Sequence, residues 1–111
     1  MVDTPDLFDP ERVALERRWR ELTDRDLPAA ATGDWPVRLN HCFQRILLDD
    51  ATGAVWYDAI PRRPAYAHAP TAVLARAIAT GEAVLEGRAD LADLNRRSLA
   101  WRGKRGPTRG A

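Results

Sequence analysis

Apolar residues recur at helical spacing in the first part of the chain. Asp9 has a side chain that caps helices well, and Pro10 suits the first helical turn. One helix face then carries apolar residues three or four positions apart, namely Leu15, Trp19 and Leu22. We expect this helix to fade near residues 24–26, because Pro28 follows, and we expect residues 28–34 to form a linker.

A second helix is expected within residues 36–50, where one arc is apolar and the opposite arc is polar. The apolar arc contains Leu39, Phe43, Ile46 and Leu47. The polar arc contains Arg38, His41, Arg45 and Asp49. Gly53 can end this helix in a left-handed conformation. The next stretch, residues 54–60, is short enough to form either a helix or a strand.

The third predicted helix is the most regular of the chain. It starts near Pro70 or Thr71 and ends at Gly87. Gly81 lies in the middle of its apolar face, where glycine costs about 1 kcal/mol of helix stability relative to alanine. The pattern therefore predicts that another helix approaches closely at Gly81. Asp90 can then cap a last helix, one side of which carries Leu91, Leu94, Ser98 and Trp101.

These patterns predict an all-α protein, a small bundle of three main helices plus one short helix or turn. Residues 1–8 are expected to form an extended N-terminus and residues 9–102 a single helical domain. Residues 103–111 are expected to be a disordered basic tail. A length of 111 residues is that of one ordinary domain, which leaves room for a core but little for a large buried catalytic cavity.

Charge is unevenly distributed along the chain, although the net charge is only +1. Residues 1–34 carry a net −4, whereas residues 94–111 carry a net +6 because they include no acidic residue. No apolar run approaches the roughly 20 residues that span a bilayer. The first residues lack the pattern of a signal peptide, and one cysteine cannot form an internal disulfide. The sequence therefore predicts a cytoplasmic protein with an arginine-rich, basic C-terminus.

The segment around residues 38–45 concentrates reactive and basic side chains. His41 and Cys42 are adjacent, and adjacent helical residues point about 100° apart, so His41 cannot activate the Cys42 thiol. We expect Cys42 to be buried and inert. Together, Arg38, His41 and Arg45 can receive a phosphate or a carboxylate. The alternative is an ordinary solvated helix face stabilised by pairs four residues apart.

Aromatic residues lie close to arginines in the sequence. The aromatic residues are Trp35, Trp56, Tyr57, Tyr66 and Trp101, and the arginines are Arg38, Arg62, Arg63 and Arg102. Such interleaving can stack bases and hold phosphates, although tryptophans also serve as core residues. We expect a small non-catalytic binding module that contacts nucleic acid or an acidic protein partner through an Arg/His helix face and the basic C-terminus. Its expected binding residues are Arg38, Asn40, His41, Gln44, Arg45, Arg97, Trp101 and Arg102.

Motifs of known catalytic and cofactor sites are missing from the sequence. The chain lacks a phosphate-binding P-loop, the glycine pattern of dinucleotide-binding folds, the paired histidines of zinc proteases and the serine elbow of hydrolases. Its two histidines and one cysteine do not have the spacing of metal ligands. The sequence therefore assigns no catalytic residue, no metal ligand, no cofactor and no membrane partner.

The segment 34–102 also resembles a group of short uncharacterised bacterial proteins that are sometimes labelled GNAT-type N-acetyltransferases. The resemblance is carried by Asp34-Trp35-Pro36, Asn40-His41-Cys42-Phe43-Gln44-Arg45-Ile46 and Leu94-Asn95-Arg96-Arg97-Ser98-Leu99-Ala100-Trp101-Arg102-Gly103. The label implies an acyl-CoA-dependent transferase with a mixed α/β domain. Its pyrophosphate loop would read Arg or Gln, two residues, Gly, one residue, then Gly or Ala. This chain has no such run, so the resemblance identifies no acetyl-CoA-binding residue.

Overall fold

The computed structural model describes residues 9–104, and this part begins with helix α1, Pro10–Glu21. The Asp9 carboxylate accepts hydrogen bonds from the backbone N–H groups of Glu11 at 3.0 Å and Arg12 at 3.3 Å. These bonds satisfy two of the donors that a helix leaves unpaired at its first turn. The predicted helix cap is therefore confirmed.

The sequence predicted that the first helix fades near residues 24–26. The structure differs, because the helical path continues beyond these residues. A π-helical turn, η2 (Leu22–Asp26), leads directly into the short helix α2, Leu27–Ala30. Proline lacks an N–H and clashes with the carbonyl four residues before it in an α-helix. The wider π turn immediately before Pro28 changes the hydrogen-bond spacing, because the Leu27 N–H donates to the carbonyl of Leu22, five residues earlier.

Helix α3, Asn40–Thr52, begins four residues later than the start of its predicted range and ends at Gly53 as expected. Gly53 has a φ of 74°, the left-handed conformation that glycine adopts without a steric penalty. Leu39 is not part of an apolar face, because it precedes the first helical turn and is 58% exposed. Asp49 belongs to the predicted polar arc, yet it is completely buried.

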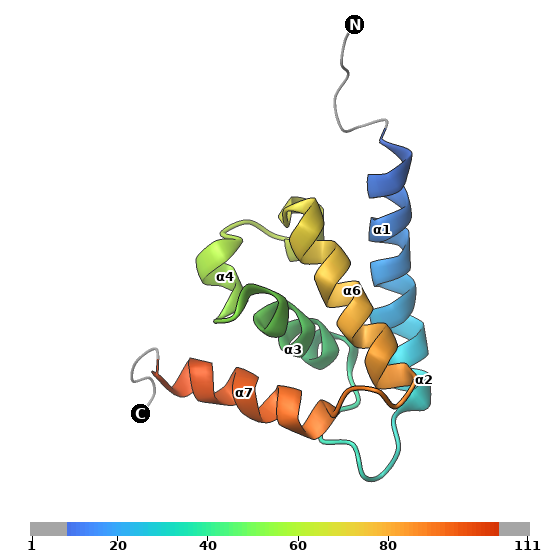
Figure 1. The fold of residues 1–111 in the computed structure, drawn as a ribbon, viewed down its shortest axis with the longest axis vertical. Helices are drawn as coiled ribbons and strands as arrows, with labels where there is room; N and C mark the ends of the chain where they lie inside the picture. The colour runs from blue at the N-terminus through green and yellow to red at the C-terminus, as the bar shows by residue number, and fades with distance from the viewer. Residues whose placement is uncertain (1–8, 105–111) are drawn as a thin grey trace, which may run out of the picture.

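Two short helices follow α3. Residues 54–60 form a helix and not a strand, since α4 spans Trp56–Ala59. A second short helix, α5 (Ala65–His68), has no counterpart in the sequence prediction and follows the connection that contains Pro64. Helix α4 lies beside α3 (Figure 1), whereas α5 contacts α1.

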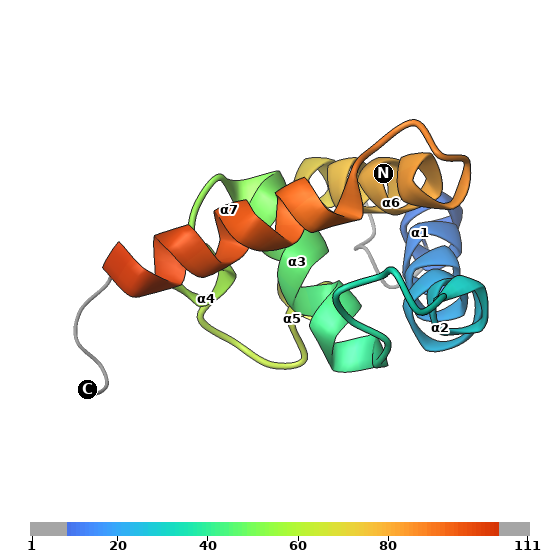
Figure 2. The ribbon, with the colours of Figure 1, turned by 90° about the horizontal axis from the view of Figure 1, so that it is seen from below.

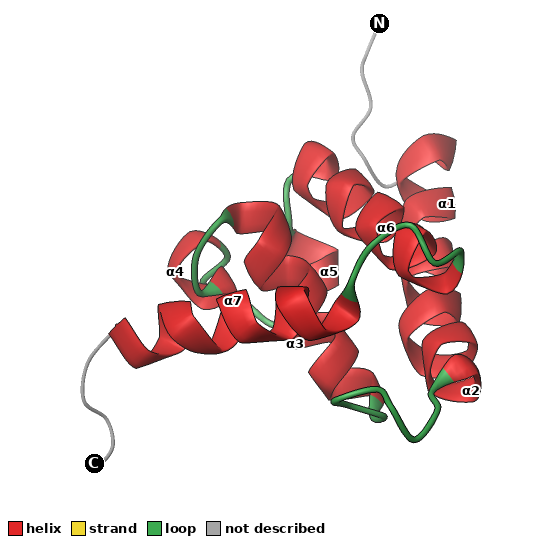
Figure 3. Ribbon diagram, turned by 60° about the horizontal axis from the view of Figure 1, so that its bottom comes forward, coloured by secondary structure: helices red, strands yellow, loops and turns green. Residues whose placement is uncertain are grey.

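The last two helices are both long. Helix α6 spans Thr71–Leu85 and helix α7 spans Leu91–Lys104. The prediction of three main helices is therefore wrong, because α7 is comparable in length to α1, α3 and α6. The domain also extends past residue 102, because Gly103 and Lys104 close α7, while residues 105–111 of the predicted tail lie outside the described residues. Residues 9–104 contain helices and loops without a strand (Figure 3), so the all-α prediction holds for them and the mixed α/β fold is not found there.

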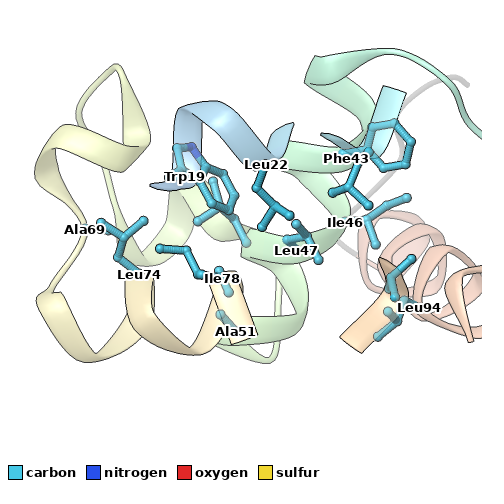
Figure 4. Packing of buried hydrophobic residues seen from close by; sticks show 14 of the residues in the cluster. Trp19, Leu22, Phe43, Ile46, Leu47, Ala51, Ala69, Leu74, Ile78 and Leu94 are labelled. Carbon is cyan, nitrogen blue, oxygen red and sulfur yellow. The ribbon is translucent and has the colours of Figure 1, made fainter. Parts of the chain in front are cut away.

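Helix α3 occupies the centre of the arrangement. It packs against α6 on one side and α7 on the other, and α6 in turn lies beside α1 (Figures 1 and 2). The buried core links these helices through Trp19, Leu22, Phe43, Ile46, Leu47, Leu74 and Ile78 (Figure 4). The close approach predicted at Gly81 is confirmed, because an added Cβ would lie 2.6 Å from Leu22 Cδ2 and 3.0 Å from Leu47 Cδ1.

Candidate functional site

A hollow of about 670 Å³ lies where α3, α4, the segment before α5, and α7 meet. Its basic lining residues are His41, Arg45, Arg63 and Arg102. Its aromatic lining residues are Trp19, Trp56, Tyr57 and Tyr66. None of the lining residues found in the described part of the chain is acidic. The hollow therefore combines the size of a small-ligand site with a basic and aromatic wall.

The buried Asp49 carboxylate joins three of the elements that form the hollow. Its Oδ2 accepts hydrogen bonds from Ser98 Oγ at 2.6 Å and Arg102 Nε at 2.9 Å, both from α7. Its Oδ1 accepts from the Trp56 backbone N–H at 2.9 Å and from Arg102 Nη2 at 3.1 Å. A buried carboxylate needs such partners, because water cannot solvate it. One side chain therefore fixes the start of α4 and the position of Arg102.

Arg45 is held in place by neutral groups. Its Nη1 donates to Ser98 Oγ at 2.7 Å, and its Nη2 donates to Asn95 Oδ1 at 2.8 Å. Ser98 has a single hydroxyl proton, which it donates to Asp49, so its oxygen is left to accept from Arg45. Asp49 thus orients Arg45 through Ser98. No carboxylate in the described part of the chain forms an ion pair with Arg45 within 4.0 Å.

The electrostatic environment of Arg45 disfavours its positive charge. Burial lowers the pKa of the Arg45 guanidinium, and the nearby charge of Arg102 lowers it further. Arginine stays protonated in spite of such a shift, because its guanidinium is the most basic of the protein side chains. An anion that entered the hollow would therefore meet a fixed, partly desolvated positive charge with no acidic competitor among the described residues of the wall.

Three arginine–aromatic pairs surround the hollow in the described structure. The Arg20 guanidinium lies 5.5 Å from the centre of the Tyr66 ring, and that of Arg63 lies 5.2 Å from the Trp56 ring. The Arg102 guanidinium lies 5.4 Å from the Tyr57 ring. Each aromatic member lines the hollow. Such pairs keep both partners ordered and present flat surfaces on which a planar group can stack.

The structure brings four of the sequence-predicted binding residues together at this hollow, namely His41, Gln44, Arg45 and Arg102. The other four lie outside it. Arg38 is exposed, and Asn40 Nδ2 donates to Asp24 Oδ1 at 2.9 Å. Arg97 pairs with Asp93 at 3.2 Å, and Trp101 is half-buried on α7. The predicted cluster of Arg38 with His41 and Arg45 is therefore not formed at the hollow.

Cys42 differs from its prediction, because it is half-buried and not fully buried. Sequence reasoning also missed the two residues that organise the site, Asp49 and Ser98. Each of the two residues has a feature in the sequence that could have indicated its role. Ser98 is a polar residue on the apolar side of its helix, and a buried hydroxyl requires a partner. Asp49 lies in the last turn of α3, where the helix dipole disfavours a carboxylate unless a cation compensates.

No family model, curated protein or solved structure matches this chain. Within residues 9–104 there is also no group of three or more His, Cys, Asp or Glu side chains placed to hold a metal ion. None of the helices described for this chain combines the length and the apolar character needed to cross a membrane.

Proposed function

We propose that this protein is a non-catalytic module that binds nucleic acid at the hollow. The observation that carries the proposal is the wall itself, in which two arginine–aromatic pairs, the ring of a third pair and Arg45 meet without an acidic lining residue among those described. Nucleic acids offer the matching chemistry, because phosphates bind guanidinium groups and bases stack on aromatic and guanidinium planes. An acidic protein offers carboxylates for Arg45, but its Asp and Glu side chains bring no ring that could stack on the aromatic wall.

The proposal assigns different roles to Arg45 and Arg102, the two partly buried arginines of the hollow. Arg102 is largely neutralised by Asp49, which it contacts at 2.9 and 3.1 Å, and it mainly supports the Tyr57 ring. Arg45 has neutral hydrogen-bond acceptors and keeps its charge available. A phosphate at Arg45 would therefore gain a charge-assisted hydrogen bond. His41, at the same wall, offers a ring N–H that can donate a hydrogen bond to a phosphate.

The test is the binding of a fluorescently labelled ten-nucleotide single strand, measured by anisotropy at several salt concentrations. Arg45→Met should weaken binding and reduce the salt slope by about 0.7 for each phosphate that the variant no longer neutralises. Arg88→Met is the matched control, because Arg88 lies after α6, is exposed, pairs with Glu86 at 2.8 Å and does not line the hollow. Arg88→Met should leave the affinity for the oligonucleotide nearly unchanged.

Two results would reject the proposal. One is the absence of salt-dependent binding to the oligonucleotide by the wild-type chain. The other is an equal decrease in affinity in Arg45→Met and Arg88→Met, which would assign binding to overall charge and not to the hollow. A poly-glutamate chain of the same charge is a second probe. If it binds as tightly as the oligonucleotide, an acidic protein partner replaces nucleic acid as the ligand.

A second candidate function, an acyl-CoA-dependent N-acetyltransferase, follows from the resemblance of segment 34–102. The feature that favours it is the same wall, because an adenine could stack beside Trp56 or Tyr57 and a pyrophosphate could contact Arg45. Thermal unfolding with acetyl-CoA tests it. A ligand at 100 times its dissociation constant stabilises its protein by about 2.7 kcal/mol, so no shift at millimolar acetyl-CoA would eliminate this candidate.

A further inference from the structure

The shape of the hollow restricts which nucleic acids can use it. Duplex DNA is read by a helix or ribbon that protrudes into a groove about 12 Å wide. Here the basic and aromatic groups line a depression of about 670 Å³, which is the opposite shape. A paired base inside a duplex cannot enter a depression unless it leaves the stack, which costs a few kcal/mol. An unpaired nucleotide enters without that cost.

The geometry of the two central rings limits the number of bases. Trp56 and Tyr57 have ring centres 5.4 Å apart and planes inclined at 81°, which is an edge-to-face arrangement. Perpendicular rings cannot hold a stack of several parallel bases between them. They form two walls at a right angle, so that one base can stack on one wall while its edge meets the other. The arrangement therefore fits one base.

Each of these walls is completed by an arginine. Arg63 lies over Trp56 and Arg102 lies over Tyr57, at 5.2 and 5.4 Å from the ring centres. A guanidinium plane is itself a surface on which unpaired bases stack. Arg45, from α3, lines the same hollow and has only neutral acceptors among the described residues. A stacking surface and a cation without a directly paired carboxylate thus belong to one depression.

We infer that the hollow takes one unpaired nucleotide, with its base against the Trp56–Tyr57 corner and its phosphate at Arg45. This inference rests on the proposed nucleic-acid function and narrows it to single-stranded or locally unpaired segments. Affinity then comes from two separable sources. Removing the base removes stacking and leaves the phosphate contact, whereas removing the Arg45 charge does the reverse.

The experiment compares the affinity of the full chain for four probes, which have equal numbers of phosphates per strand (the duplex, with two strands, has twice the total). They are a ten-nucleotide single strand, the same strand in a duplex, the same strand with abasic units in place of its nucleosides, and inorganic polyphosphate. The single strand should bind at least about tenfold more tightly than each of the other three, because stacking of one base contributes about that factor. Salt concentration is held constant, since it changes all four affinities.

Variants at the corner separate stacking from folding. Tyr57→Ala should reduce the single-strand preference to less than about threefold, whereas Tyr57→Phe keeps the ring and should retain it. Tyr57 is 39% exposed, which favours a folded alanine variant, and the thermal unfolding of both variants is measured. If Tyr57→Ala does not fold, Arg63→Met tests the other wall, because Arg63 is exposed and contacts the Trp56 ring.

The outcomes distinguish this inference from the proposed function. If no probe binds, both are wrong. If all four bind with equal affinity, polyanion binding stands and the one-nucleotide site is overturned. A preference for the duplex overturns it as well. A single-strand preference that survives Tyr57→Ala and Arg63→Met would place the stacking surface elsewhere on the molecule, and the Trp56–Tyr57 corner would be rejected.

Discussion

The Arg102 guanidinium donates two hydrogen bonds to the buried Asp49 carboxylate, at 2.9 and 3.1 Å, although 53 positions separate the two residues in the sequence. This pair is one of several polar links between α7 and α3, together with the bonds of Ser98 to Asp49 and of Arg45 to Asn95. Helix α7 lies along α3 and away from α1 (Figure 2). The attachment of α7 to the rest of the fold therefore depends on the same side chains that shape the hollow.

The first prediction concerns Asp49 itself. Asp49→Ala should lower the free energy of unfolding by about 3–5 kcal/mol, because it leaves the Arg102 charge and the Ser98 hydroxyl without their buried partner. Urea denaturation of the wild-type and variant chains measures the difference. Asp50→Asn is the matched control. Asp50 is the next residue of α3, and its ion pair with Arg97 at 3.8 Å is closer to the surface, so the change should cost less than about 1 kcal/mol. Equal destabilisation by the two substitutions would contradict the central role of Asp49.

The second prediction tests the close approach at Gly81. Gly81→Ala should lower the free energy of unfolding by up to about 2 kcal/mol, because overpacking costs about 1–3 kcal/mol and exceeds the roughly 1 kcal/mol gain in helix propensity. The new Cβ would lie 2.6 Å from Leu22 Cδ2. In a Leu22→Ala background only the contact with Leu47 Cδ1 at 3.0 Å remains, so the same substitution should cost much less than in the wild-type chain. Additive effects of the two substitutions in a double-mutant cycle would disprove the contact.

A third prediction concerns stability in acid. The hydrogen bond from Arg18, 2.6 Å long, and a second from Arg25 hold the pKa of Asp26 below its usual value. A lowered folded-state pKa gives stability that is present above the unfolded-state value of about 3.9 and is lost as the pH falls through the folded-state value.

Asp26→Asn should therefore be less stable than the wild-type chain at pH 7, by up to about 1 kcal/mol. This difference should stay constant down to about pH 5 and shrink below about pH 4. Urea denaturation at pH 7, 5 and 2.5 measures it. A difference that persisted unchanged at pH 2.5 would mean that Asp26 contributes through packing and not through its charge.

A fourth prediction links the buried network to binding. Ser98→Ala removes the acceptor of Arg45 Nη1 and a donor to Asp49. It should lower the free energy of unfolding by about 1–3 kcal/mol and weaken oligonucleotide binding at temperatures where the variant is folded. Leu99→Ala, at the neighbouring position, is the control because Leu99 is 53% exposed. Normal binding by folded Ser98→Ala would show that Arg45 does not need Ser98 for its position.

Local sequence signals determined where several helices begin and end. The Asp9 cap needs only the backbone N–H groups of the next residues, and the stop at Gly53 needs only a residue that tolerates a positive φ. The all-α character of the described part followed from helical periodicity, which also depends only on residues close together in the sequence. Four of the residues at the hollow were also named from the sequence, because basic and polar side chains at helical spacing are visible in the sequence itself.

Only the tertiary structure decided what happens between residues far apart in the chain. Periodicity placed Asp49 on a polar arc, but α7 covers the part of that arc that contains Asp49, and burial then made its pairing with Arg102 necessary. Likewise, the path beyond residues 24–26 depends on burying Leu22 and Leu27 in the core, which local proline signals do not report. The hollow is lined by residues as far apart in the sequence as Trp19 and Arg102. The sequence pattern reveals which face of a single helix is apolar. Which other helix packs against the opposite face is decided only by the packing of the whole fold.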